Sequence, residues 1–175
     1  LRENELTGEI PPGIWNLVNL DRLFLEYNNL SGEIPESFSN LINLRYCSFQ
    51  HNQLSGQIPQ SIGSFEIMIG LHLAHNQFSG MVPDGICNLV ENSNFIYVYG
   101  NQLCPPYPEC LSDEQINGPW LPGGGEENEQ DISECEGCCY EEYLANENCD
   151  GGSCFVPQCT EDCEWEPMQC WGSIG

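Results

Sequence analysis

The sequence predicts an α/β solenoid, made mostly of strands and loops, in which short parallel strands stack and a small disulfide-rich module follows. Three observations support this prediction. An asparagine recurs every 24 residues from Asn4 to Asn76, apolar residues alternate before each asparagine, and the twelve cysteines concentrate after Cys87. Self-similarity at such a period is typical of stacked repeats. Dense cysteines are typical of modules that bury little apolar surface.

Each repeat begins with an alternating apolar stretch, of which Leu20-x-x-Leu23-x-Leu25-x-x-Asn28 is the clearest copy. Alternation places one face of a short strand inward, and strands spaced by about 4.8 Å pair into a parallel sheet as the turns stack. An asparagine at each bend can satisfy backbone groups that no regular strand ladder reaches. The predicted asparagine ladder comprises Asn4, Asn28, Asn52, Asn76 and Asn101.

A second stretch follows each asparagine, as in Leu30-Ser-Gly-Glu-Ile-Pro35. Its glycine permits a tight reversal, and its proline fixes the extended segment that comes next. Cys47 occupies a leucine position of the repeat and is expected to be a small buried thiol. Apolar pairs are expected to fill the convex side of the core: Ile14 with Leu17, Phe38 with Leu41, Ile62 with Phe65, and Ile86 with Leu89.

The repeats of residues 1–110 resemble the plant-type leucine-rich repeat, which they match in register through four copies. The resemblance implies a stack whose concave strand face carries variable residues. It also implies a role like that of receptor ectodomains or polygalacturonase inhibitors. The chain begins within a repeat, so we expect upstream repeats or a neighbouring molecule to cover the first turn.

The far end of the stack is predicted to be capped by disulfides, which gives a first domain of residues 1–111. Cys110 lies about one repeat after Cys87, so these two should be neighbours on adjacent turns. Cys87–Cys110 is therefore the favoured pair, and it leaves Cys104 to pair downstream, with Cys135 as a candidate. Other pairings of the four remain open. Residues 112–133 are rich in Gly, Pro and acids, which favours an acidic linker.

Residues 134–175 are predicted to form a second, cysteine-rich module. The segment from Phe155 to Cys159, followed by Trp165 to Cys170, resembles part of a thyroglobulin type-1 domain, some members of which inhibit cysteine proteases. The family's final Cys-Trp-Cys-Val motif is absent from this chain. An odd cysteine is expected to stay free or to pair outside the module. The cysteines expected in disulfides are Cys87, Cys104, Cys110, Cys135, Cys138, Cys139, Cys149, Cys154, Cys159, Cys163 and Cys170.

The charge and cysteine content define the expected environment. A formal net charge of -24, with only three arginines and no lysine, excludes nucleic-acid binding through clustered basic residues. Twelve cysteines indicate an oxidising, extracellular location, secreted or at the cell surface. No run of about 20 apolar residues or signal peptide is present. No cofactor is expected, although the acidic C-terminal half, for example near Asp150, could bind Ca²⁺ weakly.

No arrangement of catalytic residues can be found in the sequence, so an enzyme is not expected. His51 and His75 lie one repeat apart and could approach a shared metal, although exposed histidines are the simpler interpretation. Asn29 begins the Asn-Leu-Ser glycosylation sequon. The better candidate site is the concave face, where aromatic residues on a rigid scaffold suit recognition, although ordinary surface variation is an equal alternative. Its candidate residues are Phe24, Glu26, Tyr27, Tyr46, His72, Tyr97 and Tyr99.

Three hypotheses for the function are consistent with these features of the sequence. The leading hypothesis is an extracellular structural or adhesion protein that contacts other proteins or glycans, with a filament built from copies of the chain as one form of such an assembly. The second is a recognition ectodomain of the receptor or polygalacturonase-inhibitor type. The third is a cysteine-protease inhibitor, which depends on the thyroglobulin-like segment.

Overall fold

The computed structural model describes residues 1–90, 95–118, 130–133 and 135. The chain divides into two compact units, Leu1–Cys135 and Glu136–Gly175. The second unit lies outside the described residues, and with it the thyroglobulin-like segment, its seven cysteines and the candidate calcium region near Asp150. Among the described residues, no helix combines the length and the apolar character that crossing a lipid bilayer requires.

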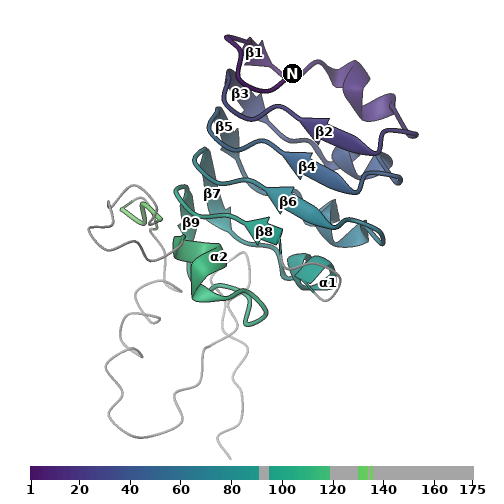
Figure 1. The fold of residues 1–175 in the computed structure, drawn as a ribbon. Coiled ribbons are helices and arrows are strands. Elements are labelled where there is room, and N and C mark those ends of the chain that lie inside the picture. Colours follow the sequence, from purple (N-terminus) through teal and green to yellow (C-terminus); the bar gives the residue numbers. More distant parts are fainter. Residues whose placement is uncertain (91–94, 119–129, 134, 136–175) are drawn as a thin grey trace, which may run out of the picture. The chain divides into compact units, whose positions relative to one another are not determined.

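The first unit is a short solenoid whose stacked turns form two parallel sheets, one of four strands and one of five (Figure 1). The apolar alternation before each asparagine forms the four-stranded sheet, which has the order β2-β4-β6-β8. Leu23, Cys47, Leu71 and Ile96 stand side by side in this sheet and are all buried. The strands are β2 (Arg22–Phe24), β4 (Tyr46–Ser48), β6 (Gly70–His72) and β8 (Phe95–Tyr97).

The stretch after each asparagine forms the five-stranded sheet, in the order β1-β3-β5-β7-β9. Its strands are β1 (Thr7–Glu9), β3 (Asn29–Glu33), β5 (Gln53–Gly56), β7 (Gln77–Met81) and β9 (Gln102–Cys104). The glycine of the repeat adopts a positive φ here, for example 83° at Gly32, as the tight reversal requires. A short helix then closes each turn. These helices are η1 (Pro12–Asn16), η2 (Glu36–Asn40), η3 (Gln60–Ser64), η4 (Asp84–Ile86) and α1 (Cys87–Val90).

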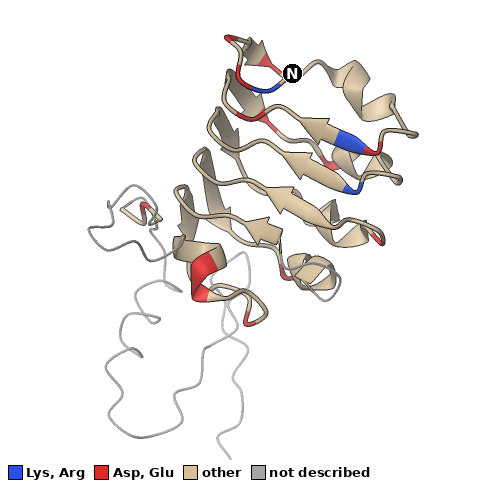
Figure 2. Cartoon of the chain, viewed as in Figure 1, with Lys and Arg blue, Asp and Glu red and all other residues tan. Residues whose placement is uncertain are grey.

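Acidic residues outnumber basic ones over the described part of the chain, and the arginines lie in its first turns (Figure 2). Arg22 opens β2 and Arg45 precedes β4. Both contact the carboxylate of Asp21, Arg22 at 3.2 Å and Arg45 through a closer hydrogen bond. The Arg45 guanidinium holds the pKa of Asp21 below its usual value. Because these groups are exposed to water, they orient the loop and add little to stability.

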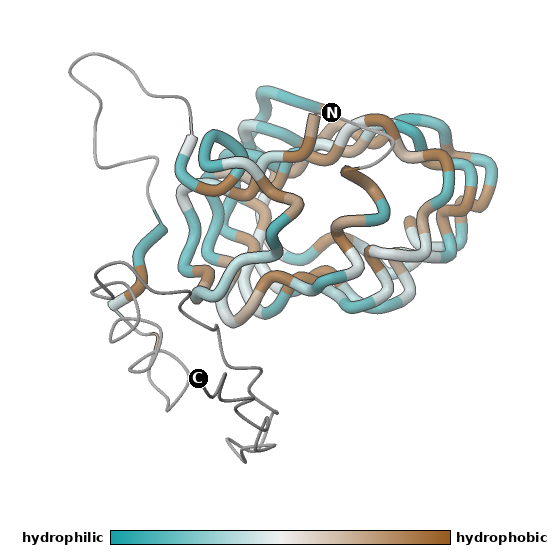
Figure 3. Tube along the Cα trace, turned by 90° about the horizontal axis from the view of Figure 1, so that it is seen from below, coloured by the Kyte–Doolittle hydropathy of each residue, from teal (hydrophilic) through white to brown (hydrophobic). Residues whose placement is uncertain are grey.

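The core runs the length of the stack between the two sheets and the short helices. Viewed along the stack, successive turns superpose, and hydrophobic positions recur in the same places (Figure 3). Cys47 is a free, buried thiol, as expected, and burial raises its pKa well above the ordinary value. Leu17 departs from the prediction for the convex core, because it is 51% exposed in the first turn while Trp15 is buried in its place. The other predicted pairs lie in the core, from Phe38 with Leu41 to Ile86 with Leu89.

The predicted asparagine ladder fixes each bend to its neighbour. The side-chain amide of Asn76 donates to the carbonyls of Leu73 and Ala74 in its own turn and to that of Phe49 in the preceding turn. Its carbonyl oxygen accepts from the backbone N–H of Leu54. Asn28, Asn52 and Asn101 repeat this arrangement. The ladder therefore sets the position of every residue next to it.

The last turn is covered by residues 102–118, 130–133 and 135. Cys87 is joined to Cys110 and Cys104 to Cys135, which are the pairings favoured from the sequence. The sequence predicts a linker from residue 112, but helix α2 (Asp113–Asn117) begins there. Ser112 caps that helix through a reciprocal bond with Gln115, so local side-chain capping outweighs the linker-like composition.

The side chain of Gln130 completes the cap. Its amide donates to the carbonyls of Val98 and Ile116, and its carbonyl oxygen accepts from the N–H of Leu103. It thus takes up the N–H of Leu103 in β9 and the carbonyl of Val98 after β8, two backbone groups of the kind that a ladder asparagine of the next turn binds elsewhere in the stack. The end of the solenoid is therefore satisfied by polar contacts as well as by disulfides.

Candidate binding face

The candidate site is the outer face of the four-stranded sheet, where the side chains between the buried positions point away from the core. Phe24, Ser48, His72 and Tyr97 stand in register across β2, β4, β6 and β8, as the repeat alignment predicts. Phe24, His72 and Tyr97 are half-buried, whereas Ser48 is buried. One row across this face therefore presents rings separated by a small hydroxyl.

A second row, the aromatic column, consists of Tyr27, His51, His75 and Tyr99. The rings of Tyr27 and His51 stack at 4.3 Å between centroids, and those of His51 and His75 stack at 4.2 Å. Tyr99 then meets His75 edge to face at 5.3 Å. Neighbouring parallel strands lie about 4.8 Å apart, so one ring per turn gives continuous contact. The structure brings together two predicted tyrosines and two histidines that the sequence left as exposed residues or metal ligands.

The backbone explains why this column projects from the stack. Tyr27, His51 and His75 each precede a ladder asparagine and have φ values of 56°, 54° and 53°. This left-handed conformation is costly for residues other than glycine, and it persists because the ladder fixes the next residue. Three successive turns therefore hold the rings of Tyr27, His51 and His75 at the same position of the repeat before any ligand binds.

The stacking also bears on the metal hypothesis for the histidines. The imidazole planes of His51 and His75 lie 16° from parallel, so the rings meet face to face and their nitrogens do not converge on one point. Over residues 1–90, 95–118, 130–133 and 135, no group of three or more His, Cys, Asp or Glu side chains could hold a metal ion.

Partial burial shifts the ionisation of this face. Burial lowers the pKa of His51 below its ordinary value, and His75 lowers it further. Burial also lowers the pKa of His72, although the carboxylate of Glu26 opposes that change. Burial raises the pKa of Tyr99. His51, His72 and Tyr99 therefore favour their neutral forms, which contact neighbouring rings without charge repulsion.

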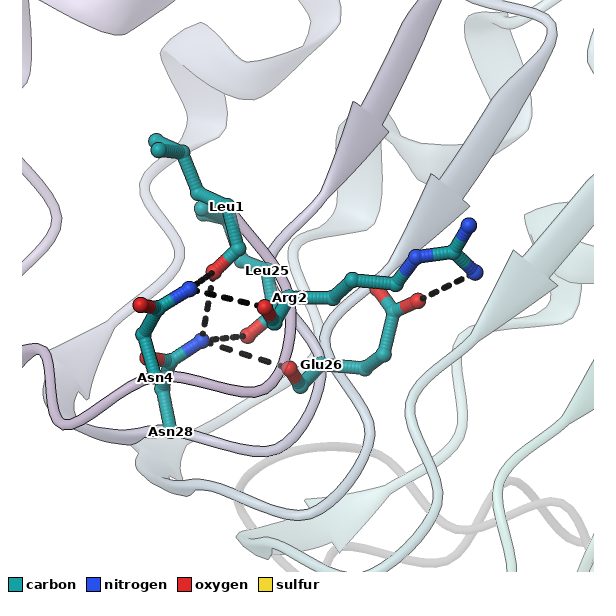
Figure 4. A network of polar contacts seen from close by, with 6 residues as sticks. All are labelled: Leu1, Arg2, Asn4, Leu25, Glu26 and Asn28. Carbon is teal, nitrogen blue, oxygen red and sulfur yellow. Dashed lines mark hydrogen bonds and ion pairs between the residues drawn. The ribbon is translucent and has the colours of Figure 1, made fainter.

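Glu26 differs from the exposed binding residue that the sequence predicts, because it is only 7% exposed. Its Oε1 lies 3.6 Å from Nη1 of Arg2, which extends alongside the carboxylate (Figure 4). Arg2 also lies 5.8 Å from the centroid of the Phe24 ring. The alternation of residues along a strand predicts which face a side chain lies on, but it does not predict how deeply neighbouring side chains bury it. Glu26 is therefore a partly paired, buried carboxylate on the face.

The remaining predicted residues lie near the edges of the face. Tyr46 is half-buried beneath the guanidinium of Arg22, 5.2 Å from its ring centroid, and stands next to Gly70 in the sheet. Asn29 is exposed at the start of β3, in the other sheet, and its glycosylation stays a prediction. The structure therefore brings Phe24, Glu26, Tyr27, His72, Tyr97 and Tyr99 to one face, with Tyr46 at its margin and Asn29 away from it.

Comparison with known proteins agrees with this architecture. Residues 19–41, 43–65 and 69–89 match the family model described as Leucine Rich Repeat. The chain contains leucine-rich repeats. No curated protein sequence matches the chain. The repeats account for the two parallel sheets and for the asparagine at every bend.

Solved structures with a similar fold are plant receptor ectodomains. A chain of the BIR3–SERK2 complex from Arabidopsis thaliana is 30% identical, with a TM-score of 0.63, covering 67% of this chain and 64% of that one. The BIR2 ectodomain from the same plant is 26% identical, with a TM-score of 0.62, covering 75% of this chain and 64% of that one.

The ectodomain of the Arabidopsis receptor kinase HAESA, solved with an extended IDA peptide hormone, is 38% identical. Its TM-score is 0.56, and the match covers 58% of this chain and 17% of that one. The chain thus spans less than a fifth of HAESA and of the GASSHO1/SCHENGEN3 and TDR receptors, which it also resembles.

Proposed function

We propose that this chain is an extracellular recognition module that binds a peptide or protein partner on the outer face of its four-stranded sheet, without catalysing a reaction. The aromatic column carries this proposal. Tyr27, His51, His75 and Tyr99 form a preordered row of rings, and rigid aromatic side chains supply large contact areas at low entropic cost. The two disulfides of the cap fit an oxidising, extracellular setting.

The similar proteins support the same proposal. The HAESA ectodomain was solved with a peptide hormone, and the GASSHO1/SCHENGEN3 ectodomain, 32% identical with a TM-score of 0.58, was solved with CASPARIAN STRIP INTEGRITY FACTOR 2. By analogy, we assign a peptide to the face of this chain. Assembly into filaments and binding of glycans stay predictions. Protease inhibition also stays a prediction, because it depends on residues outside the described part of the chain.

The test selects peptides that bind the full chain from a random library displayed on phage, and then measures the Kd of each by calorimetry. Tyr99→Ala should weaken binding about tenfold or more, because truncating an aromatic anchor costs about 1–2 kcal/mol or more. Ile42→Ala is the matched control, since Ile42 is 66% exposed but lies in the loop between η2 and β4. Its Kd should change less than twofold.

Two results would count against this function. The library could yield no binder, or the binders could tolerate Tyr99→Ala as well as Ile42→Ala. Size-exclusion chromatography and electron microscopy of the same preparation address the filament hypothesis. Regular fibres would support the structural role, whereas a monomer that binds peptides would support recognition.

A further inference from the structure

Glu26 holds a charge that its surroundings satisfy only in part. Its side chain is 9% exposed, and a buried carboxylate is stable only when it is paired and hydrogen-bonded. Oε1 has one long contact, 3.6 Å from Arg2, and Oε2 is buried with no hydrogen-bond partner among the described residues. One carboxylate oxygen on the binding face therefore lacks the donor that burial demands.

Ser48 supplies a second unsatisfied group on the same face. It is 6% exposed, and its hydroxyl also lacks a hydrogen-bond partner in the described part of the chain. Ser48 stands in register between Phe24 on β2 and His72 on β6. The carboxylate of Glu26 acts on the pKa of His72, which places it within electrostatic reach of this row. Buried polar groups without partners are rare in folded proteins, and these two lie on the same face, where the donors of a ligand would satisfy them.

Arg2 shows which chemical group this region accepts. Its guanidinium lies 3.6 Å from the carboxylate of Glu26 (Figure 4) and 5.8 Å from the centroid of the Phe24 ring. A planar cation flanked by a carboxylate and an aromatic ring is a favourable arrangement for arginine, more so than for lysine. The Arg2 side chain is nevertheless 64% exposed and makes a single contact to Glu26, so it holds its place weakly.

We propose that Glu26, Phe24 and Ser48 form a subsite for an arginine side chain of the peptide ligand, and that Arg2 occupies this subsite until the ligand displaces it. This inference rests on the proposed function for its peptide. A ligand arginine can approach Glu26 with two parallel N–H donors, which would satisfy both oxygens. The net charge of -24 attracts a basic segment to the chain. The aromatic column begins at the next residue, Tyr27, and receives the rest of the peptide.

The test titrates the full, isotope-labelled chain with Nα-acetyl-arginine methylamide and follows the backbone amides of Phe24 and Tyr27 by NMR. The citrulline analogue has the same shape without the charge, and the lysine analogue has the charge without the plane. We expect saturable shifts with the arginine compound, weaker binding of the lysine compound and none of the citrulline compound. Glu26→Gln should abolish the shifts, and Ser48→Ala should weaken binding.

Arg2→Ala provides the sharpest test. Because Arg2 competes for the subsite, its removal should tighten binding of the arginine compound about two- to fivefold, the range that exposed ion pairs contribute. Unchanged or weaker binding in this variant would overturn the proposal. Equal binding of the citrulline compound, or of the lysine compound, would also overturn it.

Folding is checked by circular dichroism. If Glu26→Gln does not fold, the Arg2→Ala and citrulline comparisons still decide the outcome. Some library peptides could bind without containing arginine and bind the Glu26→Gln variant equally well. That result would contradict the arginine subsite but not the proposed function. A library without binders would end the proposed function, whereas the titration tests the subsite independently.

Discussion

Replacing Asn76 with alanine should reveal how much one bend of the ladder contributes to stability. Asn76 is 9% exposed and makes four hydrogen bonds. Its amide donates to the carbonyls of Phe49 at 3.0 Å, Leu73 at 3.1 Å and Ala74 at 3.3 Å. Its oxygen accepts from the N–H of Leu54 at 3.0 Å. Alanine removes all four hydrogen bonds, while the backbone groups that took part in them remain inside the stack.

The cost can be worked out group by group. The N–H of Leu54 loses its side-chain acceptor, and an orphaned buried donor costs about 1–3 kcal/mol. The carbonyls of Phe49 and Leu73 keep a second donor, from Asn52 and Asn101 respectively, so their loss is smaller, about 0.5–1 kcal/mol each. The free energy of unfolding should therefore fall by about 2–5 kcal/mol.

Urea unfolding followed by far-ultraviolet circular dichroism, with the disulfides intact, measures this difference. The matched control is Asn4→Ala, at the same position of the first turn. Asn4 is exposed and donates only to the carbonyls of Leu1 and Arg2, so its removal should cost about 0.5 kcal/mol or less. If the two variants lose equal stability, the ladder does not act through buried backbone groups and the reasoning fails.

Two further predictions concern packing and pH. Gly63→Ala should destabilise the chain by about 1–3 kcal/mol, because a Cβ there would lie 2.7 Å from the Cα of Gly85. Gly13→Ala meets no atom within 4 Å, so thermal unfolding should show little change, and equal losses would contradict the close approach. His51 should titrate below pH 6.5 in an NMR titration. Because its folded pKa is lowered, the unfolded chain binds more protons, so stability should fall as the pH drops below about 6.5. His51→Gln should reduce this dependence, and an unchanged profile would contradict it.

The fold could be predicted from the sequence because the same constraint repeats in every turn. Periodic asparagines and alternating leucines fix strand, bend and register together, so the row from Phe24 to Tyr97 follows from counting alone. The Cys87–Cys110 disulfide could be predicted from the same period, because the two cysteines lie 23 residues apart, which is about one turn. Local periodic signals of this kind survive in any single sequence.

The cap and part of the site could not be predicted in this way. Ser112-x-x-Gln115 is a capping-box signature that was present in the sequence, but the surrounding Gly, Pro and acids favoured a linker. No local signal points from Gln130 back to Val98, 32 residues earlier. The buried Glu26 is paired with a side chain from another turn, Arg2, and periodicity carries no information about such a contact.

The left-handed backbone before each ladder asparagine restricts how this face can evolve. Valine, isoleucine and threonine are strongly disfavoured at positive φ, because their branched Cβ collides with the backbone there. The position holds Glu3, Tyr27, His51, His75 and Gly100 in successive turns, none of them branched at Cβ. Substitutions that change binding preference are thus drawn from a reduced set of amino acids. A lineage of such repeats would diversify at this position by exchanging rings, amides and carboxylates, while valine, isoleucine and threonine stay excluded from it.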